Sequence, residues 1–257
     1  MTTALVTGAS AGIGEAFARE LATRHHDLVL VARRTDRLEA EAVRLAASHG
    51  VAVEVLGADL GTPDGVATVV ARLADPACPV DLLVNNAGVG TAGRFWELPV
   101  EAETAMIHLN VLALVQLTHA ALGSMVARDT GGVINVSSLG AYQPVPHHAT
   151  YGATKAIVSA FTNAVREELR STNVKLMVVA PGYTRTEFQE TSFEPHGLPS
   201  FVWQSADEVA ATAMRAYARG RTVCITGAVN IAAAAASSVM PAGVMRRVSG
   251  ALTRPVS

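Results

Sequence analysis

TALVTGASAGIG, residues 3–14, joins a short apolar run to a cluster of three glycines, Gly8, Gly12 and Gly14. The run at 3–7 is typical of a buried strand, and the pattern from residue 12 onward predicts a helix. Glycines at this junction let the backbone turn tightly and approach a diphosphate, while the start of the helix presents N–H groups to the anion. The same glycines could simply end the strand, but their position between the first strand and the first helix favours a dinucleotide-binding turn.

Six further apolar runs follow along the chain: LVLVA (28–32), VAVEV (51–55), DLLVN (81–85), GVINVS (132–137), VKLMVVA (174–180) and TVCIT (222–226). Between the seven runs lie segments with helical periodicity, near 12–25, 36–49, 62–74, 101–128, 150–171 and 206–219. Uniformly apolar strands separated by helices predict a parallel sheet covered on both faces. We therefore expect an α/β fold, a Rossmann-type doubly wound sheet of seven parallel strands, in one domain over residues 1–257. Ligands of such sheets bind beyond the carboxyl ends of the strands.

Composition excludes several classes of protein. Half of the 257 residues are hydrophobic, 16% are charged and the net charge is −2, so the chain has no basic field for nucleic acid. Its two cysteines, at 78 and 224, form no CxxC pair, and the N-terminus has no charged signal-like region; both favour a cytoplasmic location. The longest weakly polar run, 228–240, is too short and Ala-rich for a membrane span and predicts a helix packed on protein. Arginines in the tail suggest either a peripheral membrane contact or a solvated face: Arg246, Arg247 and Arg254.

Cofactor choice depends on the end of the second strand. An NAD site normally has an acidic residue there to accept the ribose hydroxyls. Here LVLVARRTDRL has Ala32, Arg33 and Arg34 instead, and no acid before Asp36. A guanidinium can hold a 2′-phosphate through two hydrogen bonds, so we predict NADP, with Arg33 as its phosphate ligand. The alternative is that both arginines are surface charges at the start of a helix, and an NAD preference stays open.

YGATK, residues 151–155, places Tyr151 and Lys155 four residues apart in an expected helix, hence on one face. The chain has 20 basic residues, and lysine occurs only at Lys155 and Lys175. The pair is either a coincidental amphipathic pairing or half of an acid/base device. A free tyrosine has a pKa of about 10, and a nearby ammonium would lower it by stabilising the phenolate.

These features recur in a fixed order that resembles the classical short-chain dehydrogenase/reductase (SDR) family. The glycine spacing is G-x-x-x-G-x-G, NNAG stands at 85–88, and LNVLALVQLT at 109–118 contains Asn110. GVINVSS ends at Ser138, Tyr151 follows thirteen residues later with Lys155 after it, and PGYTRT occupies 181–186. The resemblance covers about residues 3–190, and five ordered motifs make chance a poor explanation.

The resemblance implies a catalytic tetrad of Asn110, Ser138, Tyr151 and Lys155. Ser138 would hold the substrate oxygen, Tyr151 would exchange the proton, and Lys155 would bind the nicotinamide ribose. Asn110, at a local helix irregularity, would resupply protons to Lys155 through water. In the reductive direction NADPH gives hydride to a ketone or aldehyde, and in the other direction a secondary alcohol is oxidised.

The cofactor contacts implied by the resemblance run along the whole motif set. Asp59 would contact the adenine amino group, and Thr186, or the chain near Thr184, would bond the nicotinamide carboxamide. The full expected set is Gly8, Ser10, Gly12, Ile13, Gly14, Arg33, Asp59, Asn86, Ala87, Gly88, Tyr151, Lys155, Pro181, Gly182, Thr184 and Thr186. No metal is expected, and His147 and His148 are interpreted as loop residues because no ligand cluster surrounds them.

Beyond the motifs the sequence is less informative. FQETSFEPHGLPSFVW, 188–203, belongs to an expected substrate lid at about 183–205, whose aromatics suggest an apolar pocket wall or else a small cluster pinning a loop. The segment at about 227–257 lacks the DGG-type ending of many SDRs, so a homodimer is as plausible as a homotetramer. The rival function is that of a cofactor-binding regulatory protein without turnover.

Overall fold

The computed structural model describes residues 2–188, 199–240 and 242–252. Seven strands form one sheet: β1 (Thr3–Thr7), β2 (Asp27–Ala32), β3 (Val53–Gly57), β4 (Leu82–Asn85), β5 (Gly132–Val136), β6 (Lys175–Ala180) and β9 (Val223–Ile225). They are all parallel and lie in the order β3-β2-β1-β4-β5-β6-β9. The predicted doubly wound, seven-stranded sheet is therefore confirmed.

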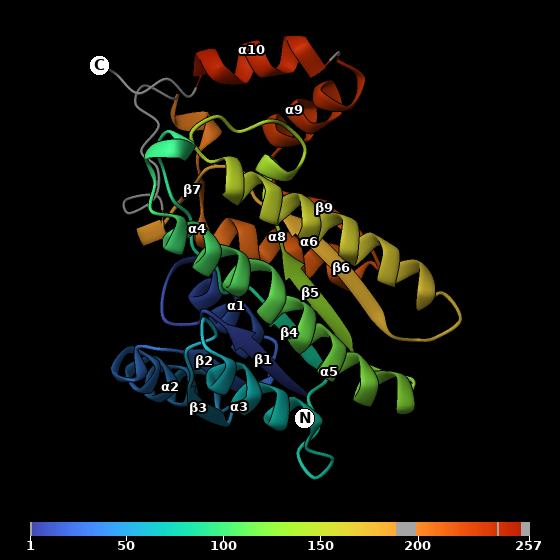
Figure 1. The fold of residues 1–257 in the computed structure, drawn as a ribbon. Helices are drawn as coiled ribbons and strands as arrows, with labels where there is room; N and C mark the ends of the chain where they lie inside the picture. The colour runs from blue at the N-terminus through green and yellow to red at the C-terminus, as the bar shows by residue number, and fades with distance from the viewer. Residues whose placement is uncertain (1, 189–198, 241, 253–257) are drawn as a thin grey trace.

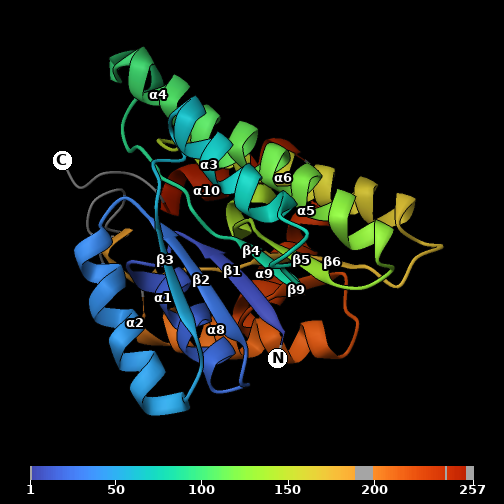
Figure 2. The same cartoon turned by 90° about the horizontal axis from the view of Figure 1, so that it is seen from below.

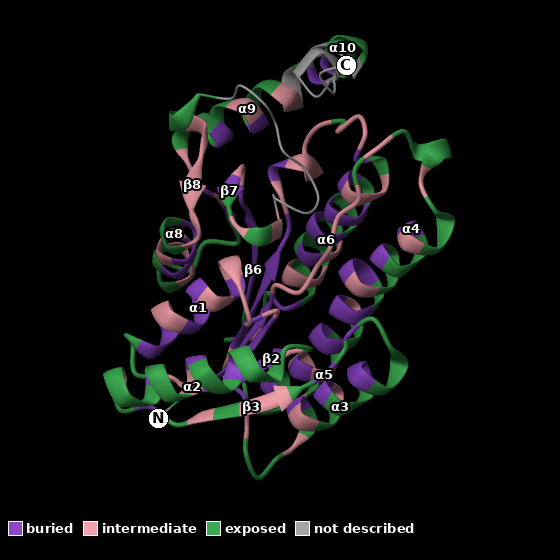
Figure 3. Cartoon of the chain, turned by 90° about the vertical axis from the view of Figure 1, so that its left-hand side faces the viewer, coloured by how far each residue is buried: buried purple, intermediate pink, exposed green. Residues whose placement is uncertain are grey.

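Helices cover both faces of the sheet (Figures 1 and 2). On one face lie α1 (Gly12–Ala22), α2 (Thr35–His49) and α8 (Ala206–Ala218), and on the other lie α3 (Pro63–Ala74), α5 (Leu114–Ala127) and α6 (Ala149–Glu168). Alternate strand residues face the two layers; Val6 packs with Phe17 of α1, whereas its neighbour Leu5 packs with Leu117 of α5. Figure 3 shows the consequence, with a buried sheet interior and an exposed outer surface on α2.

The boundaries of the edge strand β3 differ from the prediction. The run VAVEV placed the strand at 51–55, but the ladder pairs Val53 with Leu28 and Gly57 with Ala32. Val51 is buried without belonging to the ladder. An edge strand takes its register from its one neighbour, so its apolar residues alone do not locate its ends.

The predicted helix at 101–128 is interrupted. It divides into α4 (Val100–Ile107), a π-helical turn (His108–Ala113) and α5, so the irregularity expected around Asn110 is present. By length and hydropathy alone this helical stretch could cross a membrane. Its buried side chains, such as Leu117 and Met125, pack on the sheet, which accounts for its apolar character without a membrane.

Short elements hold the two ends of the predicted lid together. β7 (Thr184–Arg185) pairs with β8 (Gln204–Ser205), and the turn Ser200–Val202 precedes β8. The rings of Tyr183 and Trp203 lie 5.6 Å apart at this base. Residues 189–198 of the predicted lid lie outside the described residues.

Two further helices, α9 (Ala228–Val239) and α10 (Ala242–Leu252), follow the last strand. α9 was predicted from its small residues, whereas α10 was not predicted. Asn230 anchors α9: its side chain is 3% exposed and Nδ2 donates to the carbonyl of Thr226 at 2.7 Å. The same side chain packs on Gly182, where a Cβ would come within 2.2 Å of Nδ2. The C-terminal segment is thus joined to the predicted nicotinamide end of the site.

We expect Asn230→Ala to lower the free energy of unfolding by about 1–3 kcal/mol, because it leaves a buried carbonyl without its donor. Asn163→Ala, the same change at an exposed position on α6, is the control and should have little effect. Urea unfolding followed by circular dichroism measures both. Equal effects of the two substitutions would contradict the anchoring role of Asn230.

Candidate active site

A cavity of about 570 Å³ opens beyond the carboxyl ends of the strands, where ligands of this architecture bind. Its lining comes from the turn after β1 and from the residues that follow β2, β3, β4, β5 and β6. All but two of the predicted site residues line it. The exceptions are Gly14 and Asn110, which lie just behind its wall.

The glycine turn forms a cradle that side chains could not share. Gly8 and Gly12 have φ angles of +66° and +58°, a backbone region that favours glycine. A Cβ on Gly14 would lie 2.2 Å from the carbonyl oxygen of Gly8. α1 begins at Gly12, and the side chain of its N-cap residue, Ala11, makes no capping hydrogen bond. Its first N–H groups and its dipole therefore suit a diphosphate, as predicted.

The hydroxyl of Thr7 connects this turn to the NNAG motif. It donates to the carbonyl of Val84 at 3.3 Å and accepts from the N–H groups of Asn86 and Ala87 at 2.9 and 3.0 Å. Asn86 also donates to the carbonyl of Thr7 at 3.0 Å. This role of Thr7 was not predicted, although its place directly before Gly8 could have suggested it.

Asn85 and Asn86 have different roles. Asn85 is buried, and its Nδ2 donates to Thr118 and Asn135 at 3.0 and 2.9 Å, so it joins the sheet to the helix layer. Asn86 lines the cavity while holding the backbone of the glycine turn. The motif thus combines a structural residue with a cavity residue.

Asn110 sits in the π-helical turn and is fully engaged with the chain. Its Nδ2 donates to the carbonyl of Val89 at 2.9 Å and to Thr154 at 3.2 Å, and its Oδ1 accepts from the N–H of Val89 at 2.9 Å. A Cβ on Gly88 would lie 3.0 Å from Oδ1 of Asn110 and 3.5 Å from Nζ of Lys155. Asn110 and Lys155 therefore both lie next to Gly88.

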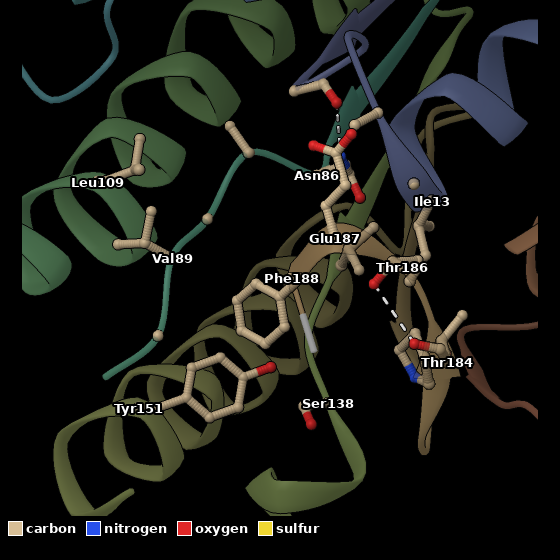
Figure 4. A pocket seen from close by; sticks show the side chains of 18 of the residues that line it. Ile13, Asn86, Val89, Leu109, Ser138, Tyr151, Thr184, Thr186, Glu187 and Phe188 are labelled. Atoms are coloured by element: carbon tan, nitrogen blue, oxygen red, sulfur yellow. Dashed lines mark hydrogen bonds between the residues drawn. The ribbon is translucent and has the colours of Figure 1, made fainter. Parts of the chain in front are cut away.

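Ser138, which follows β5, and Tyr151 and Lys155, which lie on α6, all line the cavity. Figure 4 shows the side chains of Ser138 and Tyr151 there. Burial raises the pKa of Tyr151, and the hydrogen bond with Ser138 opposes that rise. This differs from the expectation that Lys155 lowers the pKa of Tyr151. The ammonium lies 5.8 Å from the centre of the tyrosine ring, and desolvation of the phenol is the largest influence on its pKa. Tyr151 is therefore protonated at neutral pH.

Lys155 is a buried amine, 4% exposed, whose Nζ donates to the carbonyl of Val136 at 3.0 Å. Burial lowers its pKa from 10.5 to about 8. The amine can therefore give up or take a proton close to neutral pH, which an arginine could not do.

The wall around Tyr151 is largely apolar. Phe188 approaches it with ring centres 5.6 Å apart, and Val89, Leu109 and Val145 also line this end. Figure 4 shows Phe188 directed toward Tyr151 from the segment that also carries Thr186 and Glu187. The prediction of an aromatic pocket wall agrees with the position of Phe188, the first residue of that stretch.

His148 was interpreted as a loop residue, but it is 5% exposed and lines the cavity. Its Nδ1 bonds to the carbonyl of Thr91 at 2.7 Å, so Nδ1 carries the proton, and burial lowers its pKa. His148 lies three residues before Tyr151, close to one helical turn, and this spacing was the available signal. No cluster of three or more candidate metal ligands occurs in the parts of the chain that the structure describes.

At the predicted nicotinamide end, four residues of the PGYTRT segment line the cavity: Pro181, Gly182, Thr184 and Thr186. The hydroxyl of Thr184 donates to the carbonyl of Gly182 at 3.1 Å, and that of Thr186 donates to the carbonyl of Thr184 at 3.3 Å (Figure 4). The carbonyl of Pro181 accepts from the N–H of Leu139 at 2.8 Å, which holds this segment next to Ser138.

At the other end, Ser10, Arg33, Arg34 and Asp59 line the cavity. Asp59 accepts a hydrogen bond from the N–H of Gly61 at 2.9 Å, which orients its carboxylate at the end of β3. Arg34 donates to the hydroxyl of Ser10 at 3.2 Å and pairs with Glu187 at 3.0 Å. The Glu187 contact joins sequence-distant segments and was not predicted.

The pKa of Lys155 leads to a prediction about stability. Because its pKa is lower in the folded chain, the charged amine destabilises the fold below pH 8, and this cost disappears as the pH rises from about 8 to 10.5. Lys155→Met should raise the free energy of unfolding at pH 7 by about 1–2 kcal/mol, the relieved desolvation less the lost hydrogen bond. The gain should shrink above pH 8.

Urea unfolding at pH 7 and pH 10 measures this effect. Lys175→Met is the matched control, because Lys175 is exposed and should give little change at either pH. A Lys155→Met protein that is less stable than the wild type at pH 7 would overturn the prediction.

Comparison with known proteins agrees with this geometry. Residues 2–197 match the family model of the short chain dehydrogenases. An NADP-dependent 3-hydroxy acid dehydrogenase of Schizosaccharomyces pombe is 32% identical over 197 residues, which cover 76% of this chain and 75% of that protein.

Solved structures are also similar over nearly the whole chain. A short-chain dehydrogenase from Sphingobium yanoikuyae in complex with NADPH has a TM-score of 0.86 and 34% identity, covering 100% of this chain and 98% of that one. A bulky-bulky ketone specific alcohol dehydrogenase from Comamonas testosteroni has a TM-score of 0.80 and 29% identity, covering 94% and 95%. The chain belongs to the short-chain dehydrogenase family, a family of oxidoreductases, as its ordered motifs predicted.

Proposed function

We propose that this protein is an NADP(H)-dependent oxidoreductase that interconverts a carbonyl compound and a secondary alcohol. The observation that carries the proposal is one cavity with two complementary ends. Ser138, Tyr151 and Lys155 meet at one end, and the glycine turn with Arg33 and Arg34 forms the other. The related proteins named with NADP and NADPH support the choice of cofactor.

The residues present fit a dinucleotide phosphate. Gly8, Gly12 and Gly14 leave the backbone cradle open, and the N-terminus of α1 is directed at it. Arg33 is exposed at the cavity edge directly after β2, in the place where an NAD site has its acid. Asp59, Asn86, Ala87 and Gly88 would border the adenosine and ribose, and Pro181 to Thr186 the nicotinamide.

The chemistry is divided among few groups. When bound, the reduced nicotinamide supplies hydride to the carbonyl carbon. Tyr151 is protonated at neutral pH and donates its phenol proton to the carbonyl oxygen, and Ser138 donates a hydrogen bond to the same oxygen. Lys155, with a pKa of about 8, returns a proton to Tyr151 and binds ribose hydroxyls. Asn110 holds Val89 and borders Lys155, which suits a positioning role.

The substrate we propose is an apolar ketone or aldehyde, or the corresponding alcohol. Phe188 packs near the ring of Tyr151, and Val89, Leu109 and Val145 line the same cavity, which favours apolar groups beside the carbonyl. The relatives named for a hydroxy acid and for bulky ketones act on this class of functional group. A cytoplasmic location and a homodimer or homotetramer stay predictions; the exposed apolar Leu112 and Ile157, on neighbouring helical segments, would suit an interface.

Tyr151→Phe tests the chemistry. We expect NADPH consumption with a panel of apolar ketones and aldehydes to fall by about 10²-fold or more, with NADPH still bound, because the proton donor is lost. Tyr142→Phe is the matched control, since Tyr142 does not line the cavity. If NADPH binds but no carbonyl is reduced faster by the wild type than by Tyr151→Phe, the protein is a cofactor-binding regulator instead.

Arg33→Ala tests the cofactor. We expect NADPH to bind about ten-fold or more weakly and NADH to bind almost unchanged, because only NADPH has the 2′-phosphate. Arg44→Ala removes an arginine from α2 that pairs with Glu41 outside the cavity, and should change neither affinity. An unchanged NADPH preference in Arg33→Ala would reject the role of Arg33.

A further inference from the structure

The adenosine end of the cavity contains an anion that belongs to the chain itself. The carboxylate of Glu187 pairs with Arg34 at 3.0 Å and with Arg37 at 2.6 Å. Its pKa is lowered by the hydrogen bonds from Arg37 and Arg34, so it is ionised at neutral pH. Two guanidinium groups from the start of α2 thus meet one carboxylate from the segment after β7.

This ion pair lies at the phosphate-selective edge of the site. Arg34 and Glu187 both line the cavity, and Arg34 also donates to the hydroxyl of Ser10 in the glycine turn. Arg33, the predicted phosphate ligand, borders the same cavity at the next position. A 2′-phosphate bound between the end of β2 and the glycine turn would therefore meet Arg34, one of the two arginines that hold Glu187.

Glu187 lies at the adenosine end of the cavity, although its neighbour Phe188 faces the end that contains Tyr151. Figure 4 shows Phe188 directed toward Tyr151 and Glu187 directed away from it. Glu187 is the single acidic residue among the described residues of the segment from Pro181 to Phe188. Its carboxylate is therefore the one negative group that this part of the nicotinamide-end segment brings to the arginines.

We propose that Glu187 is a built-in competitor for the 2′-phosphate of NADP(H), occupying the guanidinium groups of Arg34 and Arg37 until the phosphate replaces it. The inference rests on the proposed function and extends it to a determinant of cofactor affinity. A phosphate with a charge of about −1.5 to −2 and a carboxylate repel each other at one guanidinium, so both cannot keep the same hydrogen bonds. NADH has no 2′-phosphate and leaves the Glu187 pairs undisturbed.

Glu187 is thus expected to weaken the binding of NADP(H) and not that of NAD(H). Both of its ion pairs are about half-exposed, with side-chain exposures of 43–48%, so each is of modest strength. The competition therefore adjusts affinity without abolishing binding. A purely structural ion pair would instead affect all adenine nucleotides alike.

Isothermal titration calorimetry with 2′,5′-ADP and 5′-AMP tests the proposal, because the two ligands differ in the 2′-phosphate alone. In Glu187→Gln we expect 2′,5′-ADP to bind about three- to ten-fold more tightly and 5′-AMP to stay within about two-fold of the wild type. Asp207→Asn is the matched control: it removes one carboxylate paired with Arg19, outside the cavity lining, and should change neither affinity.

A second comparison uses the partners of Glu187. In a background of Arg34→Ala with Arg37→Ala, adding Glu187→Gln should no longer tighten 2′,5′-ADP, because the competing pairs are already absent. The proposal is wrong if Glu187→Gln leaves 2′,5′-ADP unchanged, if it shifts both ligands equally, or if Asp207→Asn reproduces the effect.

These outcomes separate the inference from the proposed function. If the wild type reduces carbonyls with NADPH but Glu187→Gln does not change the affinity for 2′,5′-ADP, the inference alone fails. If the wild type binds neither NADPH nor 2′,5′-ADP, both fail.

Discussion

The hydroxyl of Thr7 joins β1 to the end of β4, and the site is arranged around this connection. With one donated and two accepted hydrogen bonds, it fixes the distance between the glycine turn and the NNAG segment. β1 is the strand at which the chain order of the sheet reverses, so a crevice opens at its carboxyl end. Gly14 and Asn86 then pack against Gly8 so closely that no side chain fits between them.

The catalytic end shows a different constraint, the burial of charge. Lys155 is enclosed near the end of β5 with a carbonyl as its partner, and its pKa falls to about 8. The same enclosure raises the pKa of Tyr151. Desolvation therefore brings the pKa of the amine toward neutral and moves the pKa of the phenol further above it. The buried charge of Lys155 lowers the stability of the fold.

At the proposed adenosine end, two arginines share one carboxylate of the same chain. Arginines at the start of α2 create a site that a carboxylate of the same chain already uses. Because Glu187 and Phe188 are adjacent in the chain, the segment that touches Tyr151 also touches these arginines. The two ends of the cavity are thus connected by one short stretch of backbone.

Much of this could be predicted from local patterns. The seven strands and the helices between them follow from apolar periodicity, and the lining positions of Ser10, Ile13, Arg33 and Asp59 follow from their places after strands. The pair Tyr151 and Lys155 follows from helical spacing. Such features depend on residues close together in the chain, where sequence distance limits spatial distance.

The tertiary structure decided the pKa values and the long-range contacts, which depend on the surroundings of each residue. The pKa of Tyr151 rises because the effect of burial exceeds that of the hydrogen bond with Ser138, and the spacing of residues in the sequence does not reveal burial. Glu187 meets Arg34 across 153 positions, and Asn230 anchors α9 against Gly182. His148 becomes a cavity residue because the loop before α6 folds onto Thr91. The sequence by itself determined the sheet, the phosphate turn and the acid/base pair, whereas desolvation and long-range pairing arise only when distant segments pack together.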